Sequence, residues 1–521
     1  MRILVVSNLL PPRMLGGFEL AALNLSAALR ERGHEVLVLT SPAERAAPEQ
    51  EGWVDRCLDV RDAYFLAAPV PDPGAQRQLE FDSQVSNPDN ARIVLERIRS
   101  FRPDHVLTFG MLGLGGLGIL AAIRDTGVPF TMNLGDDVPG RLLAGTPQEV
   151  REVYDAVDGG LFEAARYAIV SRTLGREVER SVRLGPVRYI ARGVRYPDVP
   201  RGRPRRQDGV TRFVSVGILA PHKGVDIILD AAQRLVEGGR EDFAVDFYGA
   251  GDAAGFAEAL QARGLGERLA HHGPVAQRAI AEAEAQADAL VFPTWHREPG
   301  ASTPGEAAAV GCLPILTGDC GPAEWFVDGV HALKIERDAE SLAGAMLRVM
   351  DGEIDLAAFA EAGRRLASGA LSFERSVARL ESWLTDGSQR VGAVDIDFDA
   401  ISAEIGRRDR DARVAWNRAE EESTAVPNEE PATAEAPTAA RLSLWHRGWG
   451  RLLRPIVQQE IAGARDELER RIRELDAREA ALREREAAAD ARDERVEHLL
   501  GTLRTDVLAT NQRIDALEER A

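Results

Sequence analysis

The sequence predicts an α/β protein with two doubly wound, Rossmann-like domains, followed by a tether and a long C-terminal helix or coiled coil. Short apolar runs alternate with amphipathic stretches over the first 195 residues, the alternation restarts near residue 211, and the composition changes beyond residue 385. Strands that alternate with helices pair in parallel through right-handed crossovers. Each alternating region therefore predicts one parallel sheet covered by helices on both faces.

The first predicted domain covers residues 1–195 and opens with a strand, a helix and a strand. These are ILVVSNLL, ELAALNLSAALRERG and HEVLVLTS, and the pattern continues in HVLTFG, GILAAIRDTG, VPFTMNLG, YAIVS and VRYIARGV. Residues 196–210 are basic and contain prolines, which is typical of a linker between domains. The second domain, residues 211–385, repeats the alternation in RFVSVGIL, DIILDAAQRLVEGG, FAVDFYGAG, ALVFPTW, GEAAAVG and LPILTG.

The remaining sequence is different in character. Residues 386–440 become acidic and then poor in large apolar side chains, which predicts a largely disordered tether. Residues 458–521 carry a seven-residue spacing that predicts a coiled coil with a weak middle and hence a homo-oligomer. A solitary charged helix held by Glu–Arg pairs is the alternative. The spaced positions are Ile461, Leu468, Leu475, Leu482, Ala489, Val496, Leu503, Thr510 and Leu517.

Residues 441–457, RLSLWHRGWGRLLRPIV, contain four arginines and no acidic residue. Trp445, Trp449 and Leu452 recur at roughly helical spacing, so indole rings and arginines could meet an anionic membrane surface. Docking of the tryptophans on the domains, or their inclusion in the coiled-coil core, is the alternative, and it is slightly favoured. The segment therefore leaves a peripheral membrane contact as a hypothesis.

Overall composition limits the possible functions. The 521 residues are 45% apolar, enough for two or three domains with separate cores. The formal net charge of −19 argues against a general nucleic-acid-binding protein, which must neutralise phosphates with clustered cations. Three cysteines with no metal-ligand spacing favour a reducing compartment. We expect a cytoplasmic protein. A peripheral position at the inner face of the membrane is the alternative localisation to test.

The stretch EPGASTPGE places Glu298 and Glu306 on either side of seven small or proline residues. It follows the predicted strand ALVFPTW and leads into a predicted helix, so it lies at the carboxyl end of a strand, where open α/β sheets bind ligands. Backbone amides without bulky neighbours suit a phosphate or a sugar hydroxyl, and fixed carboxylates suit diols. A purely structural alternative is a capping box, with Thr303 as N-cap and Glu306 reaching back to it.

These residues resemble the retaining glycosyltransferases of family 4, which have two Rossmann-like domains in the GT-B arrangement. The resemblance covers roughly residues 1–385, and its signature is the pair of glutamates separated by seven residues. It implies that Glu298 and the loop of Gly300, Ala301 and Ser302 hold the donor sugar, and that Glu306 holds the nucleotide ribose. The expected donor is a nucleotide-diphosphate sugar, with no metal ion and no other cofactor.

Further stretches add to the resemblance. Gly16 and Gly17 resemble the glycine loop that approaches the donor diphosphate, where a Cβ would block the backbone. Lys223 in SVGILAPHKG resembles the lysine that neutralises the leaving diphosphate. Gly249 and Gly251, with the stretch from His272 to Val275, resemble strand ends that line the cleft near the base, although His271 and His272 are also expected as structural residues.

The sequence departs from the family at two positions. Ile218 stands where an arginine is usual, so one of two expected cations is missing. Gly135 stands where a histidine is common, followed by Asp136, which we include among the candidate catalytic residues with Glu298 and Lys223. Separately, GLGGLG at residues 113–118 satisfies the dinucleotide fingerprint. It lies in a middle unit of the first domain, so nicotinamide binding is a minor alternative.

The main hypothesis is a retaining glycosyltransferase that moves a sugar from a nucleotide-diphosphate donor to a sugar, lipid-linked or small-molecule acceptor, in polysaccharide or glycolipid synthesis. The alternative is a degenerate, transferase-like scaffold that recruits partners through its coiled coil. Hydrolysis of the donor discriminates between the two.

Overall fold

The computed structural model describes residues 1–13, 16–43, 52–61, 73–157, 160–195, 209–387 and 396–425. The predicted segment 441–457 and the predicted coiled coil 458–521 lie outside these residues, as does most of the predicted linker. Within the described ranges, none of the helices is both long and apolar enough to cross a lipid bilayer.

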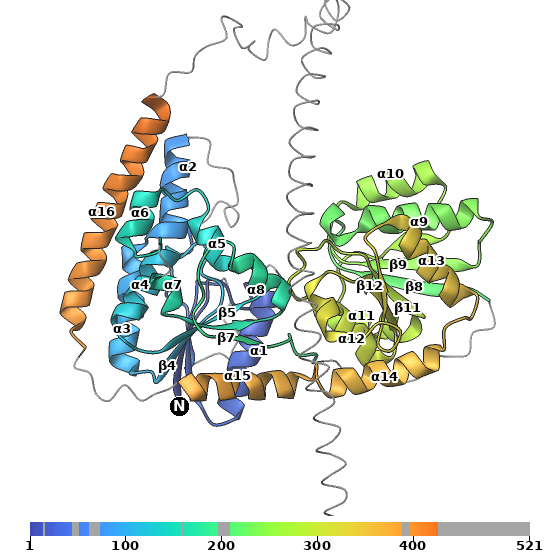
Figure 1. Cartoon of the computed structure of the whole chain (residues 1–521), viewed down its shortest axis with the longest axis horizontal. Coiled ribbons are helices and arrows are strands. Elements are labelled where there is room, and N and C mark those ends of the chain that lie inside the picture. The colour runs from blue at the N-terminus through green and yellow to red at the C-terminus, as the bar shows by residue number, and fades with distance from the viewer. Residues whose placement is uncertain are drawn as a thin grey trace, which may run out of the picture. The chain divides into compact units, whose positions relative to one another are not determined.

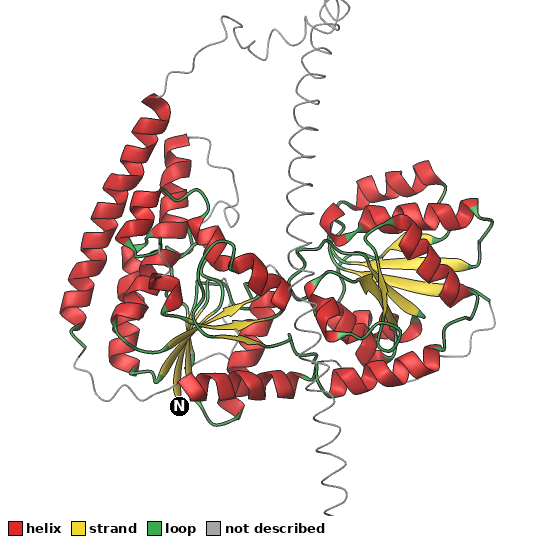
Figure 2. Cartoon of the chain, viewed as in Figure 1, coloured by secondary structure: helices red, strands yellow, loops and turns green. Residues whose placement is uncertain are grey.

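The described residues form two parallel sheets with helices on both faces (Figures 1 and 2), which confirms the predicted fold class for the two domains. The first sheet has seven strands in the order β3-β2-β1-β4-β5-β6-β7. Its strands are β1 (Arg2–Val6), β2 (Glu35–Leu39), β3 (Val54–Asp55), β4 (His105–Thr108), β5 (Phe130–Leu134), β6 (Arg166–Ile169) and β7 (Val187–Tyr189).

The helices of the first domain follow the apolar periodicity of the sequence. They are α1 (Gly17–Glu31), α2 (Pro73–Glu80), the π-helix η3 (Phe81–Val85), α3 (Pro88–Phe101), α4 (Gly116–Asp125), α5 (Val138–Leu143), α6 (Gln148–Val153), α7 (Gly160–Glu163) and α8 (Arg172–Val178). Alternate residues of β1 enter opposite cores, because successive strand side chains point to opposite faces. Ile3 and Val5 join one core, and Leu4 and Val6 join the other.

The second domain has a six-stranded parallel sheet in the order β10-β9-β8-β11-β12-β13. Its strands are β8 (Thr211–Val216), β9 (Phe243–Tyr248), β10 (Leu269–His271), β11 (Ala289–Phe292), β12 (Leu313–Thr317) and β13 (Leu333–Ile335). Its helices are η4 (Pro221–Lys223), α9 (Val225–Glu237), α10 (Ala253–Arg263), α11 (Gln277–Gln286), α12 (Thr303–Val310), η5 (Gly321–Trp325), α13 (Ala339–Met350) and α14 (Leu356–Ser368).

Helix α15 (Phe373–Gly387) corrects the predicted end of the second domain. Phe373, Val377, Leu380 and Leu384 of this helix are buried in the core formed by β1 and α1 of the first domain. Their spacing of four, three and four residues makes one apolar stripe on the helix. The chain therefore returns to the first domain near residue 372, before the predicted boundary at 385.

Helix α16 (Phe398–Ala425) corrects the predicted disordered tether. Ile401, Ile405, Ala412 and Trp416 are buried in the first domain's core. They repeat at four, seven and four residues, so one face of a mostly charged helix is apolar. The composition-based prediction was wrong for residues 398–425 because it averaged this stripe with the many polar residues around it.

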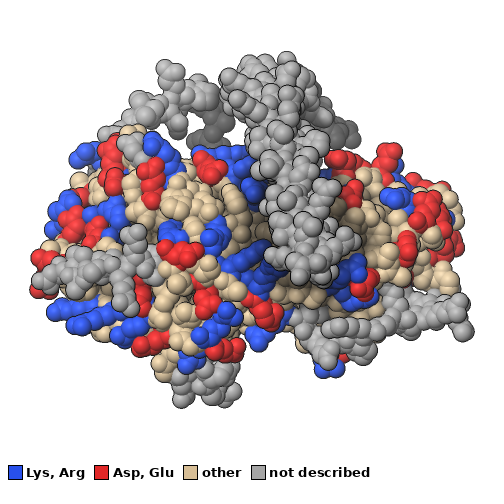
Figure 3. Space-filling model, turned by 60° about the horizontal axis from the view of Figure 1, so that its bottom comes forward, with Lys and Arg blue, Asp and Glu red and all other residues tan. Residues whose placement is uncertain are grey.

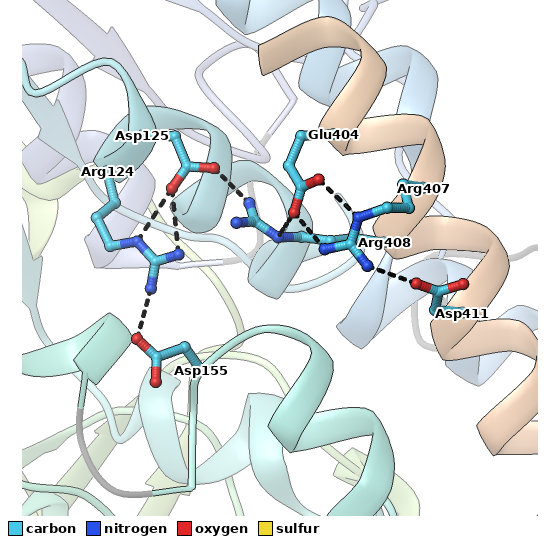
Figure 4. A network of polar contacts seen from close by, with 7 residues as sticks. All are labelled: Arg124, Asp125, Asp155, Glu404, Arg407, Arg408 and Asp411. Atoms are coloured by element: carbon cyan, nitrogen blue, oxygen red, sulfur yellow. Dashed lines mark hydrogen bonds and ion pairs between the residues drawn. The ribbon is translucent and has the colours of Figure 1, made fainter. Parts of the chain in front are cut away.

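Ion pairs complete the docking of α16 on α3, α4 and α6 (Figures 1 and 4). Arg408 of α16 pairs with Asp125 at the end of α4 and with Glu404 at 3.0 Å in its own helix. Arg124, next to Asp125, extends the network to Asp155 at 3.0 Å. Arg408 and Asp125 are largely withdrawn from water, so their pair contributes more than the about 0.2–1 kcal/mol of an exposed pair. Asp155 is 64% exposed, so its pair with Arg124 contributes little.

Candidate active site

The site is assembled at the carboxyl ends of the strands, where the two domains face each other. A cavity of about 330 Å³ lies there, with walls from α1, the ends of β5, β6 and β7, and α11, α12 and α15. Of the residues predicted from sequence, Gly17, Val275, Ser302 and Glu306 line it. On the face that Figure 3 shows, acidic and basic side chains are interspersed. We therefore identify the cations of the site by their position in the cavity.

Glu298 and Lys223 are brought together as one unit. The Lys223 Nζ donates to Glu298 Oε2 at 2.5 Å, across 75 residues of sequence. Lys223 ends η4 just after β8, and Glu298 follows β11, so the neighbouring strands β8 and β11 place them side by side. The Glu298 carboxylate is only 6% exposed. Neither Lys223 nor Glu298 is among the residues that line the two cavities, so their part in donor binding stays a prediction.

The loop after β11 and the first turn of α12 contain small residues where another part of the chain comes close. A Cβ on Gly300 would lie 2.6 Å from Val170 Cγ2, and one on Gly305 would lie 2.7 Å from Val194 Cγ2, both in the first domain. Gly300, Ala301 and Ser302 also line a second, small cavity beside the first. The small side chains therefore allow the two domains to approach, a reason that the sequence alone did not suggest.

Glu306 stands one turn into α12, and the predicted capping box is not formed. The N-cap of α12 is Ser302 and not Thr303, and its side chain makes no capping hydrogen bond. Burial raises the pKa of the Glu306 carboxyl, while hydrogen bonds with Ser302 and Gln277 and the charge of Arg192 act in the opposite direction. A carboxylate in this position can accept hydrogen bonds from a ligand in the cavity.

The glycine pair lies at the start of α1, as the sequence predicts. Gly17 is the first residue of α1 and lines the cavity. The Gly16 N–H is taken by the Glu19 carboxylate at 3.0 Å. Within this glycine loop, the surface of Gly17 is thus the part that faces the cavity.

Several predicted residues have a different local role. Asp136 pairs with Arg141 at 2.8 Å and does not line the cavity.

Gly249 and Gly251 have positive φ angles, of 144° and 151°. A Cβ on Gly249 would lie 1.9 Å from Gly217 O, and a Cβ on Gly251 would lie 2.5 Å from Leu219 Cβ. These glycines are needed where the ends of β8 and β9 touch. Their part in donor binding stays a prediction, as does the catalytic part of Asp136.

The remaining predicted features have structural explanations. His271 bonds the Gly249 carbonyl at 2.8 Å, and His272 bonds Asp246 at 2.7 Å and stacks on Tyr248. In GLGGLG, a Cβ on Gly115 would lie 2.0 Å from the Asn87 backbone nitrogen. The close approach of Asn87 therefore explains a glycine at this position without a ligand.

Arg192 is a site residue that sequence reasoning missed. It follows β7 and lines both cavities. Burial lowers the pKa of its guanidinium, and Glu298, Glu306 and Glu19 oppose this effect. The signal that could have found it is a charged residue in the stretch YIARGV, which leaves the last strand of the first sheet at the cleft.

Comparisons with known proteins now bear on this geometry. Residues 16–193 match the family model of a glycosyl transferase 4-like domain, and residues 201–366 match that of glycosyl transferases group 1. By fold and by family models, the chain is a GT-B glycosyltransferase. A search of curated protein sequences gave no match.

Solved structures share the fold of this glycosyltransferase at low sequence identity. A glycosyltransferase from Rickettsia africae is 16% identical with a TM-score of 0.55, covering 75% of this chain and 99% of its own. HepE from Anabaena in complex with UDP is 16% identical with a TM-score of 0.56, covering 74% and 100%. The sucrose-phosphate synthase of Thermosynechococcus elongatus is 16% identical with a TM-score of 0.55, covering 74% and 98%.

Proposed function

We propose that this glycosyltransferase moves a sugar from a nucleotide-diphosphate sugar to an acceptor hydroxyl with retention of the anomeric configuration. The carrying observation is the ion pair of Glu298 and Lys223 at the ends of β11 and β8, together with the cavity that Glu306 lines. In this proposal the three residues belong to one donor site, with Lys223 as the cation for a diphosphate, Glu298 as the carboxylate for sugar hydroxyls and Glu306 as the carboxylate for a ribose. HepE, which shares the fold, has been crystallised with UDP-glucose, so UDP sugars are the first donors to test.

In the proposed reaction, the bond from the anomeric carbon to the diphosphate oxygen breaks, and its electron pair stays on the diphosphate. The acceptor oxygen forms its bond on the same face of the sugar, and its proton passes to the leaving phosphate oxygen. Lys223 stabilises the charge that grows on the diphosphate, which a fixed cation does without reorganisation. Glu298 accepts hydrogen bonds from donor-sugar hydroxyls, and Glu306 accepts them from the ribose.

No metal ion is part of this proposal, because Lys223, the amides at the start of α12 and the glycine at the start of α1 can meet the negative charge. The acceptor is proposed to be a sugar, a lipid-linked molecule or a small molecule. A lipid-linked acceptor would fit a peripheral position at the inner face of the membrane through residues 441–457. Oligomerisation through residues 458–521 is likewise part of the proposal.

The test begins with a panel of UDP, GDP and ADP sugars, monitored by melting temperature and by slow hydrolysis of the donor. Nuclear magnetic resonance of the released or transferred sugar then gives the anomeric configuration. Glu298→Ala should impair transfer more than it impairs binding of the bare nucleotide, because its partners are on the sugar. A folded protein that neither binds nor hydrolyses any of these donors would instead favour the non-catalytic scaffold.

A further inference from the structure

Two arginines line the cavity, Arg192 and Arg195, and the guanidinium of Arg195 lies over the Phe373 ring at 5.2 Å from its centroid. The other cation predicted for the donor already has a partner. Lys223 is paired with Glu298, so its charge is partly neutralised before any donor arrives. Ile218, at the end of β8, is 47% exposed and brings no charge. A nucleoside diphosphate carries at least two negative charges, and tight binding calls for charge-assisted hydrogen bonds to several of its oxygens.

Arg192 lines both cavities, and its guanidinium lies beside the start of α1. A Cβ on Gly17 would lie 3.7 Å from Arg192 Nη1, so the guanidinium borders the start of α1. A Cβ on Gly135 would lie 2.8 Å from Arg192 Nη2 and 2.6 Å from Phe18 Cδ2. Arg192 and Phe18 therefore occupy the space into which a side chain at position 135 would extend.

Arg192 is held in place through its backbone while its side chain stays available. Its neighbour Ala191 accepts a hydrogen bond from Ser376 Oγ of α15 at 2.9 Å, and a Cβ on Gly193 would lie 2.5 Å from Phe373 Cα. Within the described ranges, the Arg192 guanidinium makes no hydrogen bond or ion pair. Its contact there is with the Phe18 ring, whose centroid is 5.9 Å away. An arginine with a fixed backbone and unused donors loses little entropy when it binds an anion.

We propose that Arg192 binds the diphosphate of the nucleotide sugar and supplies the second cation that position 218 does not. This inference rests on the proposed function, because it assigns a further residue to the same donor site. The planar guanidinium can donate two parallel hydrogen bonds to phosphate oxygens, in the manner that suits arginine better than lysine. It approaches the diphosphate from the first domain, opposite Lys223 of the second.

The first experiment compares diphosphate with nucleoside. Calorimetry measures the affinity of the wild type for UDP, GDP and ADP, and the diphosphate that binds best is used with its matching nucleoside. Arg192→Met should weaken diphosphate binding at least about tenfold, because it removes a charge-assisted hydrogen bond to the phosphates. It should leave nucleoside binding unchanged, because a nucleoside has no phosphate. Arg192→Lys should retain part of the affinity.

The second experiment moves the cation. Ile218→Arg in the Arg192→Met background should restore diphosphate affinity, because the guanidinium returns to the cleft from another strand end. The matched control is Arg188→Met, which removes the same charge from β7, where Arg188 lies 4.8 Å from the Trp383 ring centroid. This control should leave both affinities unchanged.

Three outcomes would overturn the inference. Equal losses for diphosphate and nucleoside in Arg192→Met would mean a general structural role. Unchanged diphosphate affinity with a raised KM for the acceptor would assign Arg192 to an anionic acceptor group. If the wild type binds no nucleotide at all, the proposed function fails first, and this inference fails with it.

Discussion

The two domains share one architecture but differ in how their parts of the site arise. The second domain contributes Lys223 from η4 after β8, and Glu298 and Glu306 from the single connection of β11 to α12. The first domain contributes Gly17 at its first crossover and Arg192 after its last strand, and helices α15 and α16 return from beyond residue 372 to cover it. The two carboxylates of the second domain are therefore local in sequence, whereas Lys223, 75 residues from Glu298, and the first domain's contribution depend on segments far apart in the chain.

This difference teaches that a motif reveals a site best where a single βα loop carries it. Arg192 can be recognised as a candidate site residue only from the fold, which brings it beside Gly17 and Gly135. Likewise, the apolar stripe of α16 can be recognised as a packing surface only from the core of the first domain that it covers. The predictions below test whether the two domains differ in stability and in chemistry as this comparison requires.

The largest expected effect concerns the stability of the first domain. Trp416→Ala should lower its free energy of unfolding by about 3–5 kcal/mol, because a buried ring in edge-to-face contact with Phe81 is removed and leaves a cavity. Urea unfolding followed by circular dichroism measures the change. Val414→Ala on the same helix, at a side chain 58% exposed, should change it by less than about 0.5 kcal/mol.

An equal shift in the unfolding of the second domain on Trp416→Ala would contradict the view that α16 stabilises the first domain alone. Fluorescent labels placed separately in each domain would show this, because a single transition in both would mean one cooperative unit. Two transitions, with only the first shifted, are expected.

The next effect is chemical and belongs to the second domain. Lys223→Ala should lower kcat at least tenfold and up to about 10³-fold, because charge on the departing diphosphate peaks in the transition state. Steady-state kinetics with the donor found in the binding panel measure it. Lys334→Ala, at the chain's other lysine, is the matched control. A lower melting temperature with unchanged turnover per folded molecule would remove Lys223 from the catalytic residues.

The sequence predicted much of this organisation, and the misses have physical causes. The alternation of apolar runs predicted both sheets because parallel strands buried on both faces are nearly continuous apolar stretches. The spacing of Glu298 and Glu306 placed both carboxylates at the carboxyl end of one strand, but the ion pair between Glu298 and Lys223 could not be predicted, since it depends on which strands lie side by side in the sheet. The crossing of α15 to the first domain could not be predicted, since an amphipathic helix does not specify which apolar surface it covers. The contacts of Gly249 and Gly251 could not be predicted either, because they depend on the chain that follows β8 in the neighbouring position of the sheet.

A smaller effect concerns the pH dependence of binding. The pKa of Glu306 is raised by burial, so its carboxylate begins to take up a proton at a higher pH than an ordinary glutamate does. Protonation removes hydrogen-bond acceptor capacity for the ribose, so nucleoside affinity should fall as pH decreases through this raised pKa, by about tenfold. Calorimetry with the nucleoside avoids titration of the phosphates. Glu306→Gln should bind weakly at all pH values, and a retained pH dependence would assign it to another group.

The smallest expected effect concerns the chain beyond α16. Removal of residues 427–521 should leave turnover and the stability of both domains unchanged while converting an oligomer to a monomer, as measured by light scattering and kinetics. Removal from residue 396 onward should in addition destabilise the first domain, because α16 is lost with the tail. Full-length protein that is already monomeric would contradict the coiled-coil prediction for residues 458–521.

The chain passes between the domains twice, and the two passages are bonded to each other. Val194 N donates to Leu371 O at 2.8 Å, and Phe373 N donates to Val194 O at 3.2 Å, which pairs the segments as a short parallel bridge. Both crossings therefore share one attachment point, and neither segment can shift there without breaking the hydrogen bonds to the other. Arg192 lies two residues from Val194, so its backbone is fixed at the place where the chain leaves the first domain and where it returns.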